Sequence, residues 1–456
     1  MHSIKSFLES YKLINIAVVI GVLFYIVALN SFIEPQARLV GVIAFLVTLW
    51  TNSGLHMGTV SLLPILLFPL FGLLESKEVV TNYSKTTIFL FIGGFLIAIA
   101  TEKSGLHKLI ATKLIAIFPK TPRGVLLSLM IATAVLSSIL SNTTTVLLLI
   151  PMAVFLTPNA DYRFRLLLGV AYSSAMGGIL TPVGTPPNLI LQDFLESNAL
   201  EMISFATWTT MMLPLSIIMI FITAEVLLYG FKKENFELVS MDTDHAPLSL
   251  AQKKLIAILV LLTVILAANP ILKHFFGILI NEKLTLLAFG LLLFLPKLDL
   301  LEWQEDFAKI PFAIVFLFGA GFSIAMAFQK TGLATEIANI MMSFNYLSPM
   351  VLMLIVGIGV VFATELTSNT ALTSIMIPII YPFATQSGLD PTLFMLIVAI
   401  SASYAFMLPI ATAPNAIAMS TGDVKITEMI KRGFFLNIIG IIVTFAVALN
   451  YWKLFL

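Results

Sequence analysis

The tripeptide Ser-Asn-Thr occurs twice within long apolar segments, at residues 141–143 and 368–370. Each copy supplies two hydroxyl oxygens and one amide oxygen, and neutral oxygen ligands suit a hard cation such as Na⁺. A further hydroxyl precedes each copy by four residues, Ser137 before Ser141 and Thr364 before Ser368. Residues four apart share one face of a helix. Each tripeptide therefore predicts a small oxygen-lined cation pocket.

A proline-containing segment follows each tripeptide, Thr-Pro-Val-Gly-Thr-Pro-Pro-Asn at 181–188 and Leu-Pro-Ile-Ala-Thr-Ala-Pro-Asn at 408–415. Proline removes amide donors and blocks the helical ladder, which frees carbonyl groups. The half-helix that begins after such a break offers amide donors and a positive dipole end to an anion. Gly184 permits a close backbone approach, and its counterpart is Ala411. The alternative is that these residues only cap and kink helices.

Charge is missing from these segments. Residues 124–160, 166–192 and 391–422 contain no charged side chain. Burying an unpaired divalent anion is very costly, so bound cations and helix dipoles are the natural compensation. This pattern favours cation-coupled anion transport and also fits a carrier of cations alone. Glu365 is the one acid near the second tripeptide, where the first half has Ser138; it either supports the structure or relays a proton.

The composition indicates an all-α polytopic membrane protein. Of the 456 residues, 59% are hydrophobic and 11% charged, whereas a soluble domain carries roughly 25% charged residues. The mean hydropathy is +1.03. A net charge of +1 provides no basic field for nucleic acid, and the absence of cysteine excludes disulfides and thiolate chemistry. No sequence motif of a hydrolase or nucleotide-binding enzyme occurs, so we expect neither catalytic residues nor an organic cofactor.

A helix needs about 20 apolar residues to cross the hydrocarbon. About 11 crossings are expected, at residues 13–33, 39–53, 56–74, 86–102, 166–196, 205–231, 253–270, 278–296, 309–329, 391–421 and 427–452. The stretches 123–157 and 347–387 are longer than one crossing, shorter than two, and interrupted by the Ser-Asn-Thr tripeptides. We interpret them as re-entrant hairpins, which survive in a membrane where protein or water surrounds the tip. Two short full crossings are the alternative.

An internal repeat links the two tripeptides. Residues 89–106 and 316–333 are identical at eleven of eighteen positions, and the same offset of 227 relates Asn142 to Asn369 and Pro187 to Pro414. Five expected crossings separate the tripeptides, so the copies should lie in opposite orientations. Inverted repeats with interrupted helices are typical of secondary transporters. The predicted divisions are N-terminal scaffold spans 1–80, repeat one 81–232, a connector with linking spans 233–305, and repeat two 306–456.

Lysine and arginine residues predict the orientation. They cluster before the first hairpin, at Lys103, Lys108, Lys113, Lys120 and Arg123, whereas the segment before the second hairpin has only Lys330. The first hairpin should therefore open toward the cytoplasm and the second toward the outside. This places the N-terminus in the cytoplasm. No small-residue cleavage site follows the first apolar block, so we expect that block to be the first crossing.

At these residues the chain resembles the divalent anion/sodium symporter family, the sodium-dicarboxylate and citrate carriers. The resemblance covers nearly the whole chain and rests on both Ser-Asn-Thr tips. It also rests on the stretch Ala-Ser-Tyr-Ala-Phe-Met-Leu-Pro-Ile-Ala at 402–411, followed by Asn-Ala-Ile at 415–417, which is similar to the family signature. That signature usually closes with Val, where this chain has Ala418.

The resemblance implies an elevator mechanism in a homodimer, with a scaffold of early spans and a transport domain of hairpins and broken helices. It implies one sodium site at Ser137, Ser141, Asn142 and Gly184, and a second at Thr364, Thr367, Asn369 and Ala411. The substrate carboxylates would bind at Ser141, Asn142, Thr143, Thr185, Ser368, Asn369, Thr370 and Thr412. One departure is Thr412-Ala413-Pro414, where the family commonly has Thr-Pro-Pro; it affects the expected shape of the anion pocket.

The sequence thus predicts a sodium-coupled importer of C4-dicarboxylates such as succinate, malate or fumarate, in a bacterial inner membrane. Its expected partners are the anion, the lipid bilayer and a second copy of the chain. A sodium-independent dicarboxylate or citrate exchanger is one alternative. A proton-coupled ion or oxyanion carrier and a channel are the others.

Overall fold

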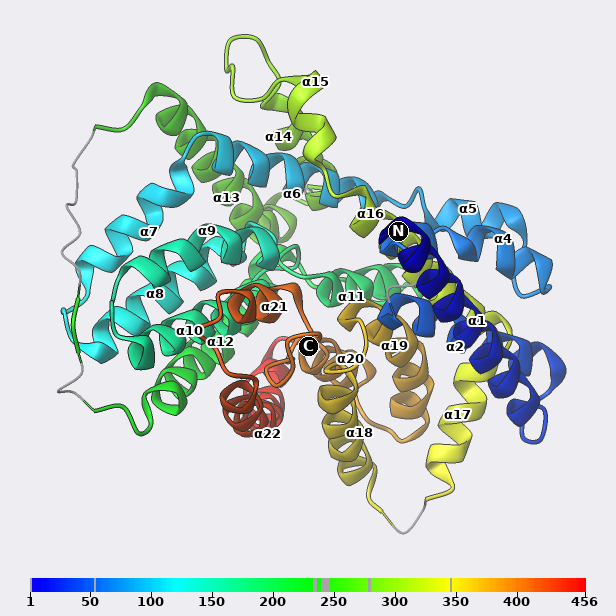
Figure 1. Cartoon of the computed structure of the whole chain (residues 1–456). Coiled ribbons are helices and arrows are strands. Elements are labelled where there is room, and N and C mark those ends of the chain that lie inside the picture. Colours follow the sequence, from blue (N-terminus) through cyan, green and yellow to red (C-terminus); the bar gives the residue numbers. More distant parts are fainter. Residues whose placement is uncertain (1, 53–54, 233–235, 239–246, 278–279, 345–346) are drawn as a thin grey trace.

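The computed structural model describes residues 2–52, 55–232, 236–238, 247–277, 280–344 and 347–456, which form helices and turns without a β-strand (Figure 1). Six helices in this part of the chain are long and apolar enough to cross a bilayer. The all-α membrane fold is therefore confirmed, while the number of crossings, about 11, stays a prediction. Parts of the connector, 233–235 and 239–246, lie outside the described residues.

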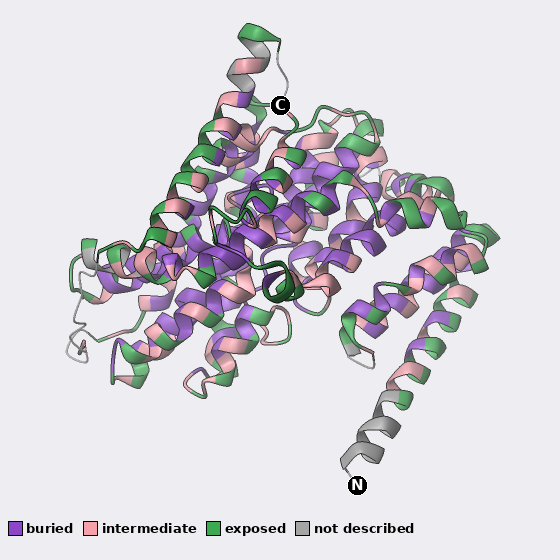
Figure 2. Cartoon of the chain, turned by 90° about the horizontal axis from the view of Figure 1, so that it is seen from above, coloured by how far each residue is buried: buried purple, intermediate pink, exposed green. Residues whose placement is uncertain are grey.

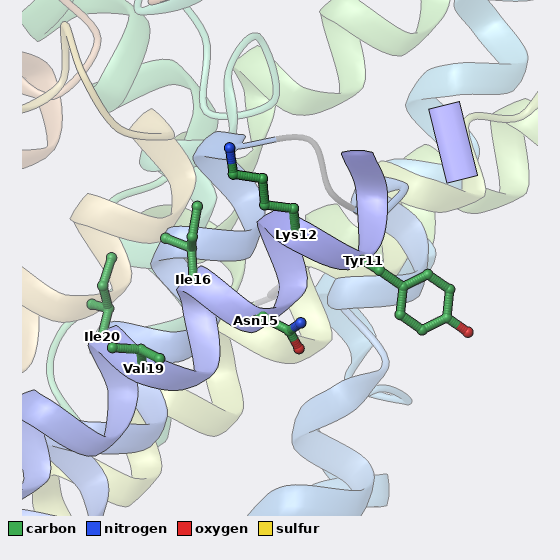
Figure 3. Close-up of a pocket in the computed structure, with 6 residues that line it drawn as sticks. All are labelled: Tyr11, Lys12, Asn15, Ile16, Val19 and Ile20. Carbon is green, nitrogen blue, oxygen red and sulfur yellow. The ribbon is translucent and has the colours of Figure 1, made fainter. Parts of the chain in front are cut away.

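The N-terminal region consists of α1 (His2–Ala28), α2 (Glu34–Asn52), α3 (Met57–Val60), α4 (Leu63–Leu70) and α5 (Ser76–Asn82). Gly21 and Gly41 bring α1 and α2 together, since a Cβ on Gly41 would lie 2.9 Å from the Gly21 carbonyl oxygen. The outer side of α1 is exposed (Figure 2) and carries a shallow hollow lined by Tyr11, Lys12, Asn15, Ile16, Val19 and Ile20 (Figure 3). An apolar exposed face of this kind suits contact with lipid.

The expected crossing 56–74 differs from the structure, which divides it into α3 and α4 around a turn at Ser61 and Leu62. The cause is local: Pro64 occupies the first turn of α4 and lacks an amide proton, so the ladder cannot continue through it from α3. The expected crossing 39–53 begins too late, because α2 starts at Glu34 and includes the polar residues Gln36 and Arg38.

The first repeat comprises α6 (Thr86–Lys103), α7 (Leu106–Ile117), α8 (Pro122–Ser137), α9 (Asn142–Phe155), α10 (Ala160–Gly178), α11 (Pro186–Ser197) and α12 (Phe205–Leu228). Linking helices follow at α13 (Leu250–Phe276), α14 (Glu282–Leu292) and α15 (Trp303–Asp306), the last continued by a 3₁₀ turn at Phe307–Lys309. The short helix α7 was not expected from the sequence.

The second repeat comprises α16 (Phe312–Lys330), α17 (Leu333–Met342), α18 (Pro349–Ala363), α19 (Asn369–Gln386), α20 (Pro391–Ser401), α21 (Ala413–Ser420) and α22 (Ile426–Asn450), with a 3₁₀ turn at Trp452–Leu454. Four pairs of helices start 227 residues apart, at 106 and 333, 122 and 349, 142 and 369, and 186 and 413. The repeated sequence thus folds into a repeated order of helices.

One contact between the repeats joins two residues that are counterparts of each other. Phe91 of α6 stacks on Phe318 of α16, with ring centroids 3.7 Å apart and an interplanar angle of 12°. These two residues are counterparts at the offset of 227. A contact between counterparts is what a two-fold relation between the repeats would produce. The opposite orientation of the repeats in the membrane stays a prediction.

Close backbone contacts also hold α6 against α14. A Cβ on Gly93 would lie 2.5 Å from the carbonyl oxygen of Leu286 on α14, and one on Gly290 would lie 2.8 Å from Gly93 Cα. Small residues that let two helices approach in this way are typical of membrane proteins. The helices α6, α14 and α16 therefore form a tightly packed frame beside the hairpins and broken helices.

Candidate functional site

The first hairpin bends at residues 138–141, between α8 and α9. Ser141 caps α9, because its hydroxyl oxygen accepts a hydrogen bond from the Thr144 amide at 3.1 Å. The buried Ser137 hydroxyl lies 2.7 Å from Asn142 Oδ1 and 2.8 Å from the Ser174 carbonyl oxygen. One hydroxyl hydrogen thus faces two acceptor oxygens, which leaves an excess of acceptors. A cation is the ligand that satisfies such an excess.

The second hairpin repeats this geometry at residues 364–368, between α18 and α19. The buried Thr364 hydroxyl lies 2.6 Å from Asn369 Oδ1 and 2.8 Å from the Ala402 carbonyl oxygen. Thr367 donates its hydroxyl proton to the Ala363 carbonyl at 2.8 Å. The structure therefore builds two acceptor-rich clusters, Ser137–Asn142–Ser174 and Thr364–Asn369–Ala402.

The long helices that follow the hairpins are both interrupted. Residues 179–185 separate α10 from α11, and residues 402–412 separate α20 from α21. The Asn188 side-chain amide donates to the carbonyl oxygens of Gly178 at 3.0 Å and Thr181 at 2.8 Å. Asn415 donates to Ala405 at 2.8 Å and Leu408 at 3.0 Å. These acceptors are counterparts, so both asparagines clamp the loop that precedes their half-helix.

Gly184 allows the first break to fold back on itself. A Cβ at this position would lie 2.4 Å from the Gly178 carbonyl oxygen, closer than any real side chain comes. Gly178 in turn approaches the hairpin tip, because a Cβ there would lie 2.7 Å from Asn142 Oδ1. The two glycines therefore press the break against the first acceptor-rich cluster. Alanine occupies both counterpart positions, Ala411 and Ala405, in the second break.

The two repeats interlock at these breaks. The half-helix α11 of the first repeat packs on α19 of the second hairpin, and α21 of the second repeat packs on α9 of the first hairpin (Figure 1). Four helices begin beside the breaks, at Asn142, Pro186, Asn369 and Ala413. Each brings unpaired amide groups and the positive end of its dipole. This arrangement suits an anion placed between cation sites.

The expected anion ligands occupy the first turns or caps of these four helices. Thr143 and Thr370 are the second residues of α9 and α19, and Ser368 caps α19. Thr185 is buried at the cap of α11, while Thr412 caps α21 by accepting the Asn415 amide at 3.3 Å. Their assignment as anion ligands stays a prediction. Asn188 and Asn415 act on carbonyl groups instead, a clamping role that the sequence pattern alone did not identify.

A family model described as "Citrate transporter" matches residues 42–399 of the chain. The sodium-dependent dicarboxylate transporter SdcS of Staphylococcus saprophyticus is 30% identical over 464 residues, which cover 94% of this chain and 89% of that protein. The chain belongs to the divalent anion/sodium symporter family. SdcS of Staphylococcus aureus is 28% identical over the same shares of the two chains. An uncharacterized transporter of Haemophilus influenzae is 30% identical over 96% of this chain and 97% of that protein.

Two solved structures share the fold of this divalent anion/sodium symporter family member. Neisseria gonorrhoeae MtrF, described as belonging to a class of antimetabolite efflux pumps, has a TM-score of 0.58 and 13% identity, and the match covers 82% of this chain and 83% of MtrF. The YdaH transporter of Alcanivorax borkumensis has a TM-score of 0.59 and 14% identity, and the match covers 81% of this chain and 86% of YdaH. Membership of the family identifies the chain as a membrane transporter of a small anion, and the two structures show its fold.

The glycine contacts generate a prediction for the first break. Gly184→Ala should lower the maximal transport rate at least about ten-fold, because the added methyl group meets the Gly178 backbone and displaces the break from Asn142. Uptake of the transported anion by membrane vesicles, normalised to protein in the membrane, is the measurement. Gly359→Ala in α18 is the matched control, since a Cβ there meets no atom within 4 Å. Wild-type uptake by Gly184→Ala would show that the close contact is not required.

Proposed function

We propose that the chain is a secondary active transporter that couples the entry of Na⁺ to the uptake of C4-dicarboxylates such as succinate, malate and fumarate. The observation that carries the proposal is the pair of acceptor-rich clusters, in each of which one hydroxyl hydrogen faces two acceptor oxygens. Hard cations prefer oxygen ligands. Because the ligand oxygens of these clusters are uncharged, they favour a monovalent cation, which they can also release during transport. The name of the SdcS relatives supports sodium as that ion.

A dicarboxylate fits the space between the clusters on electrostatic grounds. The hairpins and broken helices contain no lysine or arginine within 124–160, 166–192, 347–387 and 391–421, so the protein itself offers no base to pair with an anion. Two sodium ions and the amino ends of α9, α11, α19 and α21 supply the positive charge instead. Binding of the anion thus depends on prior binding of cations, which is the basis of coupling.

The proposed sites follow the positions reached from the sequence. Ser137, Ser141, Asn142 and Gly184 would bind one sodium ion. Thr364, Thr367, Asn369 and Ala411 would bind the other. The carboxylates would contact the tips of both hairpins together with Thr185 and Thr412. Ser137 and Thr364 lie in the clusters, and Gly184 and Ala411 lie in the adjoining breaks.

We further propose that transport proceeds by an elevator movement in a homodimer, with inverted repeats and a cytoplasmic N-terminus in a bacterial inner membrane. The frame of α6, α14 and α16 would stay fixed while the hairpins, α10–α12 and α20–α22 move. Polar contacts cross this boundary: Lys85 pairs with Asp193 of α11 at 2.7 Å, and Gln329 of α16 donates to Asn198 at 2.9 Å. These contacts must break in one of the two end states.

The direct test is uptake of labelled succinate by proteoliposomes that contain the purified chain. We expect saturable accumulation that requires an inward Na⁺ gradient, is not supported by K⁺, and is competed by malate and fumarate. Unlabelled citrate and sulfate in the same assay report the breadth of the anion pocket. Uptake that ignores Na⁺ but needs internal dicarboxylate would contradict symport and indicate exchange. Uncoupled, non-saturating conductance would indicate a channel.

The clusters predict the effect of removing their amide oxygens. Asn142→Ala and Asn369→Ala should each reduce sodium-driven uptake at least about 100-fold, because each removes one acceptor of a cluster. Thr133→Ala on α8 is the control, since this buried hydroxyl bonds only within its own helix, to Leu129 at 2.7 Å. The amount of folded protein is measured by size-exclusion chromatography in detergent. Wild-type uptake by both asparagine variants would contradict the site assignment.

The elevator movement predicts the effect of a cross-link, and the absence of cysteine makes the test clean. Gln329→Cys combined with Asn198→Cys places the sole thiol pair across the boundary between frame and moving part. A short bifunctional thiol reagent should arrest uptake, and reduction of a cleavable reagent should restore it. Arg163→Cys with Asp423→Cys is the control, because both residues lie in the moving part, 3.3 Å apart. Full uptake after complete cross-linking of the first pair would contradict the elevator.

A further inference from the structure

Glu365 is a buried acid whose partners are all neutral donors. Its Oε1 atom accepts hydrogen bonds from the backbone amides of Phe406 at 2.7 Å and Met407 at 2.8 Å, and from the Asn437 side-chain amide at 2.7 Å. Its Oε2 atom accepts from the Leu408 amide at 2.9 Å. Hydrogen bonds donated to both carboxylate oxygens stabilise the ionised form. Burial opposes that form, and the four donated hydrogen bonds offset this cost, so the ionised carboxylate is the form that these donors fit.

These three amides are available because the second helix breaks early. The first helix, α10, continues to Gly178, whereas α20 stops at Ser401, four residues before the counterpart of Gly178. Gly177 explains the difference, since a Cβ there would lie 2.2 Å from the Ala134 carbonyl oxygen. Its counterpart is Tyr404, which cannot approach a neighbouring helix so closely. The helix α20 therefore ends at Ser401, and the backbone amides of residues 406–408 have no helical carbonyl to bond.

Two side chains then bind the non-helical residues 405–408, one at their amide groups and the other at their carbonyl groups. Glu365 accepts from its amide groups, while Asn415 donates to the carbonyls of Ala405 and Leu408. The first break has the asparagine clamp through Asn188, but Ser138 stands in place of the acid and donates to Val135 of its own helix. Glu365 thus compensates for the longer break of the second repeat.

The position of Glu365 gives it a second effect. It directly follows Thr364, whose hydroxyl belongs to the Thr364–Asn369–Ala402 cluster. A negative charge near a bound cation, in surroundings of low polarity, strengthens binding of the cation by about ten-fold. The Ser137–Asn142–Ser174 cluster has no acid at the counterpart position, where the serine is uncharged. The two clusters are therefore alike in ligands and unlike in charge.

We propose that Glu365 is a positioning residue that makes the second cluster the tighter of the two cation sites. This inference rests on the proposed sodium coupling. The carboxylate fixes residues 406–408, which lead to the broken half-helix α21, and its charge favours occupation of the second site before the first. The consequence is an ordered binding of two sodium ions that the similar ligand sets alone would not produce.

Glu365→Gln tests this inference, because glutamine keeps the size of the side chain but removes the charge and points an NH₂ group at amides that need an acceptor. We expect the Na⁺ concentration for half-maximal succinate uptake to rise about ten-fold, with a smaller change in the succinate KM at saturating Na⁺. Thermal stabilisation of the detergent-solubilised protein by Na⁺ alone should require correspondingly more Na⁺. The control, Ser138→Ala, should leave both Na⁺ titrations unchanged.

Two further variants separate the effect of hydrogen-bond geometry from the effect of charge. They also allow a test if Glu365→Gln does not fold. Asn437→Ser removes one of four donors and keeps the charge, so it should shift the Na⁺ titrations less than about three-fold. Glu365→Asp keeps the charge but shortens its reach, so its Na⁺ requirement should fall between wild type and Glu365→Gln. Wild-type Na⁺ titrations in Glu365→Gln, or in Glu365→Asp if Glu365→Gln does not fold, would overturn the inference. Sodium-independent uptake by the wild type would contradict the proposed function instead.

Discussion

A helix that is interrupted inside a membrane must satisfy its freed backbone groups from within the protein, since lipid offers no hydrogen bonds. The structure meets this constraint with few side chains. Asn188 and Asn415 bind the carbonyls released on one side of each break, and Glu365 binds the amides released in the second. The Ser174 and Ala402 carbonyls remain for the hydroxyls of the hairpins. The oxygens that suit a cation are thus what remains once the breaks are otherwise satisfied.

The interlocked packing explains why the hairpins and breaks act together. Because α11 lies on α19 and α21 lies on α9, neither repeat completes its surroundings alone. A shift of one half-helix necessarily alters the hairpin of the other repeat. Energetic coupling between two sites can be carried by packed elements that touch both, and the two exchanged half-helices are such elements. The chemistry of one cluster is therefore connected to the other by packing.

The sequence located the interruptions of the helices more sharply than it located the ends of the other helices. The tips were predicted to the residue, and α9 and α19 begin at Asn142 and Asn369. Prolines and a 227-residue offset are local and repeated signals, which explains this success. The division of 56–74 into α3 and α4 was missed because its apolar composition hides a turn. The partners of Glu365 were also beyond reach, since Phe406 and Asn437 lie 41 and 72 residues away in the chain and meet it only through packing.

The stacked pair Phe91 and Phe318 is a contact between counterpart residues of the two repeats. In an assembly of two identical chains, every substitution would appear on both sides of such a contact, and neither copy could change alone. A single chain that carries both copies is free of this restriction. Gly184 can then have Ala411 as its counterpart, Gly177 can have Tyr404, and Ser138 can have Glu365. Fusion of the repeats is what allows two similar clusters to differ in the residue beside them, serine in one copy and glutamate in the other.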